Sequence, residues 1–485
     1  MKKIVLIITA ICISLSGIYI SGCKNLQTGT SSYYISCSLS DDMVLSGTET
    51  VTYYNSSENV VKELSFNLYG NAFRKDAKYK PISAQYYSNA YPNGINYGSM
   101  TIDGARVGEK DAKFTICGED KNVVTIDLER EVFPDETVTV SLDFSLNLAD
   151  VVARTGYNEK TINLGNFYPI LCVYEDGKFY ECVYHHNGDP FYSECSNYVV
   201  DFSVSDEYKV ASAGKTLKKI QKDGISTYTF SLDNARSFSM VLSKYFSVKT
   251  ENKNGVEVGY YYYDDNNPDQ SFDYILKSLD FFGEKFGKYA YSSYSVVQTK
   301  FVQGGMEYPT LVMISDNLDE KSYGEVIVHE TAHQWWQSAV GNNEIKYGFL
   351  DEGLAEYSVV LFYENFKEYG MTREFMVTSA EESYRTYCTV YDKLFGKVNT
   401  KMLRNLNEFD SEYEYVNIAY IKSCIMYDYL RKTIGDNRFF LALKKYYSDY
   451  CFKIATPYDL VGAFEKTGAD TNGFFESFFL GKVIL

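Results

Sequence analysis

Basic residues, histidine, tryptophan and proline are all scarce in this chain of 485 residues. It has 47 Lys and Arg against 64 Asp and Glu, a formal net charge of −17, with only 4 His, 2 Trp and 8 Pro. Without a basic surplus there is little to neutralise phosphates, so we expect no nucleic-acid partner. The length and the hydrophobic content of 45% suffice for two substantial cores, which predicts two domains.

Closely paired cysteines are also missing. The 10 cysteines include no Cys-x-x-Cys motif, which argues against a structural zinc cluster. Cys172, Cys182 and Cys195 are close enough in sequence to permit a disulfide in an exported protein, and buried free thiols are an equally good interpretation. The sequence therefore leaves the pairing open.

Apolar runs long enough to cross a bilayer are absent beyond the N-terminus, where one short run follows Lys2 and Lys3. This run extends to about residue 20 and is typical of a signal peptide. The "ISGC" that ends at Cys23 resembles a bacterial lipobox. We expect residues 1–22 to be a lipoprotein signal peptide and Cys23 to carry lipid, which predicts an extracytoplasmic, membrane-anchored lipoprotein at the cell surface or periplasmic face. The alternative is an uncleaved signal anchor.

Two kinds of hydrophobic periodicity divide the chain near residues 246–258. Before this boundary period two dominates, as in "ETVTVSLDFSLNL" (136–148), which predicts strands with one solvated face. After it, "DQSFDYILKSLDFFGEKFG" (269–287) carries an apolar helical stripe, and two strand-like runs follow. The rest is expected to be mostly helical, with helices at about 321–340, 350–368, 371–390, 416–434, 436–448 and 457–466. The predicted fold is a β domain followed by an α+β domain.

The segment "GEVIVHETAHQWW" (324–336) holds two of the four histidines. Because four residues of helix advance about 400°, His329 and His333 project from one face and can bind one Zn²⁺. Glu330 lies beside them, within reach of a water on the metal. An ordinary core helix is the alternative, and the two readings are compatible because the neighbouring apolar residues can seat the helix in the core.

A catalytic zinc needs a third protein ligand and an open position. A second helix starts in "YGFLDEGLAEYSVV" (347–360), and Glu352, just inside it, supplies that ligand after a turn. Glu356 shares its face one turn later and is a candidate to orient a ligand imidazole. A solvated helix carboxylate is an equally good interpretation of Glu356.

The pair "HETAHQWW" and "LDEGLAEY" is similar to the aminopeptidase N family of zinc metallopeptidases, within the gluzincins. The segment "VQGGMEYPT" (302–310) resembles the Gly-x-Met-Glu-Asn segment of that family. The resemblance implies an edge strand along which substrate lies, formed by Gly304, Gly305 and Met306, with Glu307 gripping the free α-amine. Tyr308 departs from the asparagine that is more common there.

Further residues are implied by the same resemblance. Tyr420 in "AYIKSC" matches the catalytic tyrosine, with Ser423 in place of a glycine. In a chain with 47 tyrosines there are nearby rivals at Tyr413, Tyr415 and Tyr427.

The β domain of the family contributes an amide or carboxylate to the amine site. Asn166 is the nearest candidate here. His185 and His186 are adjacent, so on extended backbone they are expected to point apart, as loop residues facing the cleft or solvent.

The resemblance implies an N-terminal saddle-like β-sandwich domain at 23–248 and a thermolysin-like, mostly helical zinc peptidase domain at 249–485. The chain ends about where the catalytic domain ends in the family. We therefore expect a short form without the C-terminal helical domain, whose cleft is open or closed by a partner.

The predicted function is a zinc-dependent aminopeptidase with one Zn²⁺ per chain, acting on peptides with a free N-terminus. His329, His333 and Glu352 would hold the metal that activates water, while Glu330 acts as general base and Tyr420 stabilises the oxyanion. Two alternatives stay open: a gluzincin endopeptidase, and a non-catalytic peptide-binding surface lipoprotein.

Overall fold

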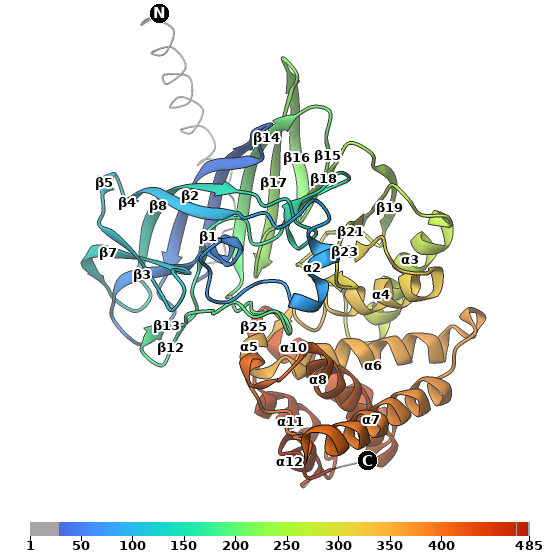
Figure 1. Cartoon of the computed structure of the whole chain (residues 1–485). Coiled ribbons are helices and arrows are strands. Elements are labelled where there is room, and N and C mark those ends of the chain that lie inside the picture. The colour runs from blue at the N-terminus through green and yellow to red at the C-terminus, as the bar shows by residue number, and fades with distance from the viewer. Residues whose placement is uncertain (1–28, 472, 484–485) are drawn as a thin grey trace, which may run out of the picture.

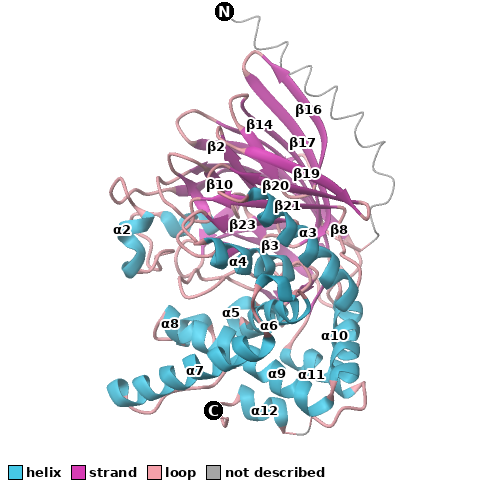
Figure 2. Cartoon of the chain, turned by 90° about the vertical axis from the view of Figure 1, so that its right-hand side faces the viewer, coloured by secondary structure: helices cyan, strands magenta, loops and turns pink. Residues whose placement is uncertain are grey.

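Strands fill the first half of the chain and helices most of the second in the computed structural model (Figures 1 and 2). The structure describes residues 29–471 and 473–483, so the predicted signal peptide and Cys23 lie outside the described residues. Within these described ranges, no helix has the length and apolar character needed to cross a membrane.

The largest sheet has eight strands, and its core-facing residues alternate as the sequence predicts. In β8 (Thr137–Asn147) every second residue is buried, from Val138 to Leu146. Seven strands join β8 in the order β16 (Lys215–Lys222), β17 (Ile225–Ala235), β14 (Ser196–Ser205), β1 (Ser32–Leu39), β2 (Val44–Tyr54), β8, β4 (Ser99–Val107) and β5 (Lys110–Asp111). All pairs are antiparallel except β1 with β14.

Smaller sheets complete the β domain and share its core. One has the order β15 (Lys209–Ser212), β18 (Met240–Ser243), β10 (Ile162–Leu164) and β9 (Thr155–Tyr157). Another has the order β11 (Ile170–Leu171), β3 (Val61–Asn67), β7 (Val123–Val132) and β6 (Phe114–Cys117), and β12 (Tyr174–Glu175) pairs with β13 (Lys178–Phe179). Short helical turns lie between strands: η1 (Tyr69–Phe73), η2 (Ala84–Tyr86) and α2 (Tyr87–Ala90). The prediction of a many-stranded β domain is confirmed.

The eight cysteines within the described residues are all free, including the three that the sequence allowed to form a disulfide. Burial raises the pKa of the Cys182 thiol to about 12, which keeps that thiol protonated and unreactive.

A five-stranded sheet begins the second half of the chain and has the short strand β22 (Gly305–Met306) at one edge. Its order is β19 (Ser247–Lys253), β20 (Val256–Tyr262), β21 (Ser293–Thr299), β23 (Leu311–Ser315) and β22. The strands β20, β21 and β23 are parallel, and β22 runs antiparallel at the edge. Helix α3 (Pro268–Lys285) connects β20 to β21 and buries the predicted stripe, with Ile275 and Phe282 fully covered.

Helices form the remainder, below the sheets in Figure 1. Those outside α3 are α4 (Glu320–Ala332), α5 (Glu344–Tyr347), α6 (Phe349–Asn365), η3 (Lys367–Tyr369), α7 (Arg373–Phe395), η4 (Leu406–Glu408), α8 (Glu412–Tyr415), the π-helix η5 (Val416–Lys422), α9 (Ser423–Ile434), α10 (Asp436–Tyr450), α11 (Pro457–Glu465) and α12 (Phe474–Phe479). The predicted β-then-helical architecture is confirmed.

One predicted boundary is wrong: α4 ends at Ala332 rather than near residue 340. The amide of Ser338 donates to the carbonyl of His333, and Gln337 has φ of 145°, so the chain turns out of the helix. The strand β24 (Val340–Gly341) then pairs with β25 (Lys453–Ile454). The early end matters because His333 becomes the capping residue of α4.

Candidate active site

A cleft of about 400 Å³ lies between the β domain and the helices. Its walls come from loops of the β domain, the edge strand β22, the facing helices α4 and α6, the helices α7 and α8, and the π-helix η5. The residues that line the cleft include Arg154, His186, Asp189, Gln303, Gly304, Gly305, Glu307, Glu325, Val326, His329, Glu330, His333, Glu352, Glu356, Val359, Met376, Tyr415 and Tyr420. The cleft therefore gathers most residues that the sequence singled out.

Three side chains from α4 and α6 converge in this cleft. His329 lies in the last turn of α4, His333 caps its end, and Glu352 lies in the first turn of α6. Glu352 Oε2 is 3.3 Å from His329 Nε2 and 3.2 Å from His333 Nε2, and the two Nε2 atoms are 3.0 Å apart. Donor atoms of the three residues all lie within 4.8 Å of one another.

The chemistry of this donor set fits zinc. Two imidazoles and one carboxylate suit Zn²⁺ and leave a coordination position open for water or substrate. Behind the donors, His333 Nδ1 is 3.0 Å from the carbonyl oxygen of Trp336, and His329 Nδ1 is 3.3 Å from Glu356 Oε2. These outer contacts hold both rings toward the same point.

Glu330 follows His329 and also faces the cleft. It is 5% exposed, and its Oε2 atom has no hydrogen-bond partner among the described residues. Burial raises the pKa of Glu330 to about 7. A Cβ atom on Gly305 would lie 2.2 Å from Glu330 Oε1, so only a glycine leaves room for this carboxylate. A buried carboxylate with an open oxygen beside the donors is placed to exchange a proton with a reacting group.

Tyr420 is presented by the π-helix η5, a helix type that often occurs at functional sites. Its hydroxyl donates a hydrogen bond of 2.5 Å to Glu352 Oε1, and its ring stacks on that of His329. Burial, together with the charge of Glu352, raises the pKa of Tyr420 well above its ordinary value, so the hydroxyl remains a donor.

The rival tyrosines are placed differently. Tyr413 is 62% exposed, and Tyr427 is buried away from the described lining of the cleft. Tyr415 lines the cleft and packs edge-on against Tyr420, yet the hydroxyl beside the donors belongs to Tyr420.

The edge strand β22 forms one wall of the cleft. Because side chains alternate along a strand, Gly305 and Glu307 face the cleft while Met306 faces the opposite side, in a small cavity behind the strand. Met306 can therefore serve substrate only through its backbone. Glu307 is 3% exposed, and its Oε1 atom has no hydrogen-bond partner in the described part of the chain. Donor atoms of Glu307, His333 and Asp351 lie within 4.8 Å of one another.

The expectation for Asn166 needs correction, because its side chain does not line the cleft. Asn166 lies behind the edge strand, where its Oδ1 atom accepts a hydrogen bond of 2.7 Å from the Tyr308 hydroxyl. Tyr308, at the position where the resemblance implies asparagine, lines the same small cavity as Asn166. The β-domain carboxylate that reaches the cleft is Asp189, which forms a buried ion pair with Arg154.

Asp189 was missed in the sequence, although it lies three residues after His186 in a loop expected near the cleft. The two histidines also differ from expectation: the rings of His185 and His186 stack, with centroids 4.7 Å apart, instead of pointing apart. His186 lines the cleft. Within the described residues they do not belong to a group of close metal donors.

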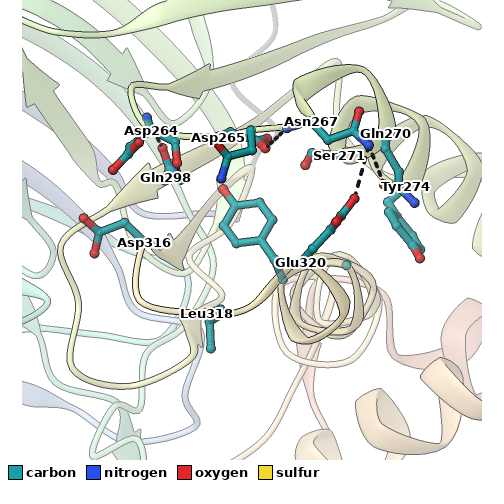
Figure 3. Close-up of a pocket in the computed structure, with 13 residues that line it drawn as sticks. Asp264, Asp265, Asn267, Gln270, Ser271, Tyr274, Gln298, Asp316, Leu318 and Glu320 are labelled. Carbon is teal, nitrogen blue, oxygen red and sulfur yellow. Dashed lines mark hydrogen bonds between the residues drawn. The ribbon is translucent and has the colours of Figure 1, made fainter.

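A second cavity, of about 100 Å³, lies at the N-terminal end of α4 (Figure 3). Asp264, Asp265, Asp316 and Glu320 line it. Its polar groups largely satisfy one another: Asp265 accepts from the Tyr260 hydroxyl at 2.5 Å, and Glu320 accepts from the Asn267 amide at 3.2 Å. Its described lining contains no histidine, so the cleft is the better candidate for metal chemistry.

Comparison with known proteins agrees with this site. The family model described as "Peptidase family M1 domain" matches residues 270–478. Aminopeptidase B of Mus musculus is 28% identical over 188 residues, 35% of this chain and 27% of the relative. Leucine aminopeptidase 2 of Neosartorya fischeri is 24% identical over 185 residues, 35% of this chain and 28% of the relative. The chain thus spans little more than a quarter of these curated relatives.

Solved structures show the same fold over nearly the whole chain. An M1 zinc metallopeptidase from Deinococcus radiodurans aligns with a TM-score of 0.67 at 16% identity, covering 94% of both chains. A variant of it bound to a Tyr-Ser-Ala substrate aligns with a TM-score of 0.64, also at 16% identity and 94% of both chains. The resemblance seen in the sequence is confirmed: residues 270–478 of this chain are a peptidase family M1 domain, within the two-domain fold of an M1 zinc metallopeptidase.

Proposed function

We propose that this protein is a zinc-dependent aminopeptidase that removes N-terminal amino acids from peptides. The observation that carries the proposal is the position of Glu307. Its buried carboxylate, with one oxygen free of protein partners, lies beside His333 in the cleft that holds the zinc donors. A free α-ammonium bound there leaves room for a single residue before the metal site. Relatives named aminopeptidase B and leucine aminopeptidase 2 support the same activity.

The residues divide the chemistry among them. Zn²⁺ held by His329, His333 and Glu352 would supply a Lewis acid that polarises the scissile carbonyl and lowers the pKa of water. Glu330 accepts the proton of the attacking water and passes it to the leaving amine. Tyr420 donates its hydroxyl hydrogen bond to the oxygen on which negative charge develops.

Substrate position is fixed by the acidic end of the cleft. Glu307 pairs with the α-ammonium, while the charge of Asp189 is balanced by Arg154. Arg154 holds Asp189 in place through the buried ion pair. Fixing the amine in this way holds the first peptide bond over the metal site, which converts binding into orientation.

The test compares a peptide with a free N-terminus and its N-acetylated form, using the zinc-loaded protein. We expect release of single N-terminal residues from the free peptide and resistance of the acetylated one. Glu330→Gln should lower kcat by about 10²–10⁴-fold while one zinc per chain is retained, because the general base is lost and the donors are not. Metal content and product masses are the measurements.

The alternatives give different results in the same assay. An endopeptidase would cut the free and acetylated peptides equally, and Glu307→Gln would affect both substrates alike. A peptide-binding protein would bind peptides but release no product, with or without Glu330→Gln. The matched control is Glu320→Gln, on the same helix as Glu330 and outside the cleft.

We also propose that the chain is exported and anchored through lipid on Cys23. The support is the sequence of its first 23 residues, with two lysines, an apolar run and "ISGC". Metabolic labelling with a radioactive fatty acid should mark the wild-type chain and not Cys23→Ala. Unlabelled wild-type chain in the cytoplasmic fraction would contradict this proposal.

A further inference from the structure

The edge strand shows in which direction a bound peptide runs. Glu307 follows β22 at the amine end of the cleft. A Cβ on Gly305 would meet Glu330, whereas one on Gly304 would lie 3.5 Å from Val326 Cγ2. From residue 307 back to 304 the cleft therefore passes from the amine site, through the general base, to Val326, one turn before His329. A peptide held by its α-ammonium places its first peptide bond at Glu330 and its second residue beside Val326.

Two carboxylates lie where that second residue would be. Glu325 precedes Val326 on α4, and Glu356 lies one turn after Glu352 on the facing helix α6; both line the cleft. Their charges interact, because burial raises the pKa of Glu325 and the Glu356 carboxylate adds to the increase. Two acidic groups on facing helices make this end of the cleft attractive to a cation.

The protein itself compensates these charges poorly. Lys321 Nζ is 3.6 Å from Glu325 Oε1, but its side chain is 64% exposed, and such surface pairs are weak and easily exchanged. Only one carboxylate oxygen of Glu356, Oε2, takes part in the contact with His329 Nδ1. Among the described residues that line the cleft, seven are Asp or Glu, and Arg154 is the only Lys or Arg. Arg154 pairs with Asp189 at the opposite end, so its charge is not available here.

Apolar side chains accompany the carboxylates. Val326 follows Glu325 on α4, Val359 lies one turn after Glu356 on α6, and Met376 of α7 also lines the cleft. They provide a surface for the methylene stem of a long side chain, while Glu325 meets the charged head. Lysine and arginine combine these two features.

We propose that the cleft selects peptides whose second residue is lysine or arginine, with Glu325 as the specificity-determining residue and Glu356 as its neighbour in charge. This inference rests on the proposed aminopeptidase function, because it uses the register set by the α-ammonium. The second residue becomes the N-terminal residue of the shortened peptide. The enzyme therefore favours peptides with lysine or arginine at the second position, whichever first residue it removes.

The experiment measures kcat/KM for the zinc-loaded protein on the tripeptides Ala-Lys-Ala, Ala-Leu-Ala and Ala-Glu-Ala. We expect the order Lys, Leu, Glu, with roughly 5- to 20-fold between Lys and Leu, the scale of one or two partly exposed ion pairs. The Lys advantage should shrink as salt rises from 20 to 500 mM, because exposed charges are screened. Glu325→Gln should reduce the Lys-to-Leu ratio to below about threefold. Glu325→Lys should invert the order of Lys and Glu.

A control variant and a second substrate distinguish the possible outcomes. Glu320→Gln, five residues earlier on the same helix and outside the cleft, should leave the ratio unchanged. Equal rates on the three tripeptides, or an unchanged ratio in Glu325→Gln, would overturn the inference while the aminopeptidase proposal stands. An alanyl anilide has no second side chain and separates the two: failure to cleave both it and the tripeptides would overturn the proposed function together with this inference.

Discussion

Gly304 and Gly305, adjacent residues at the start of the edge strand, have very different surroundings. Gly305 lies against the Glu330 carboxylate, where a methyl group would come within 2.2 Å of an oxygen. A methyl group on Gly304 would lie 3.5 Å from Val326 Cγ2, which is ordinary van der Waals contact. Neither glycine has a positive φ, so the difference between them is steric and concerns the position of the general base.

Gly305→Ala should therefore lower kcat/KM on an aminoacyl anilide by about 100-fold, because the new methyl group displaces Glu330 by an ångström or more. Gly304→Ala is the control and should keep most of the activity. Zinc content should stay at one per chain in both variants. Equal loss in both variants would mean that the strand backbone, and not Glu330, responds to the methyl group.

At the residue scale, the sequence predicts site residues that lie close together in short motifs. It does not predict side-chain directions that depend on contacts with distant parts of the chain. His329, His333 and Glu352 lie within 24 residues of one another, at the end of α4 and the start of α6, and the spacing of their motifs predicts that they converge. Asn166 and Asp189 belong to β-domain loops, whose side-chain directions depend on Tyr308 and Arg154. The sequence "NGDPFY" shows an aspartate at position 189, but it does not show that its side chain reaches the cleft.

Among the elements, β2 contains a polar residue at a core position. Glu49 is fully buried, and neither of its carboxylate oxygens has a hydrogen-bond partner in the described part of the structure. Its strand neighbours are Ile35 on β1 and Leu142 on β8. Burial raises the pKa of Glu49 well above its ordinary value, so the folded protein holds this proton while the unfolded chain releases it.

A raised carboxyl pKa means that the folded state binds more protons, so stability falls as pH rises above about 4.5, the ordinary value. Glu49→Gln should remove this penalty and raise the free energy of unfolding by about 1–3 kcal/mol at pH 8, with a smaller gain at pH 5. Denaturant unfolding at the two pH values checks it. The exposed Glu63→Gln on β3 is the control, and an identical gain for Glu49→Gln at both pH values would contradict the ionisation argument.

The strands and most helices followed from periodicity because burial of alternate or every third to fourth residue is a local property. Two features of the helices did not. The end of α4 is set by pairing of β24 with β25, a strand more than a hundred residues later. The π-helix that presents Tyr420 has an α-like residue pattern, and its wider turn shows only in the backbone hydrogen bonds.

At the scale of the whole molecule, one arginine ties the β domain to two segments of the helical half that are far apart in the sequence. Arg236 is 4% exposed and donates to four backbone carbonyls: Ser193 at 2.9 Å, Gln337 at 2.9 Å, Ala339 at 3.5 Å and Lys453 at 2.5 Å. These carbonyls belong to the β domain, to the turns after α4 and to β25. The guanidinium thereby fixes the chain just beyond the zinc donors relative to the β domain.

Arg236→Met should destabilise the protein by on the order of 3 kcal/mol or more, because it leaves buried carbonyls without donors. A lower thermal midpoint with a single transition is expected, since both halves share the interface. Arg130→Met, an exposed arginine on β7, should change the free energy of unfolding by less than about 0.5 kcal/mol. If the two variants had the same midpoint, the arginine would not be joining the two halves.

The contacts between the two halves are the feature of the fold that the sequence predicts least well. A boundary near residues 246–258 could be inferred from the change in periodicity. The partners of Arg236 could not, because they are main-chain carbonyls that are identical at every position of the sequence.

The early end of α4 has a consequence for the tautomeric state of His333. In a helix continuing to residue 340, the Trp336 carbonyl would accept the amide of that residue and be withdrawn from the imidazole. Because the chain turns away, this carbonyl instead faces His333 Nδ1 at 3.0 Å. The contact favours the proton on Nδ1. The lone pair of Nε2 is then free and directed at the point where the three donor atoms converge. A helix that stopped eight residues short of its apolar pattern thus chooses which nitrogen of the ring is available to a metal.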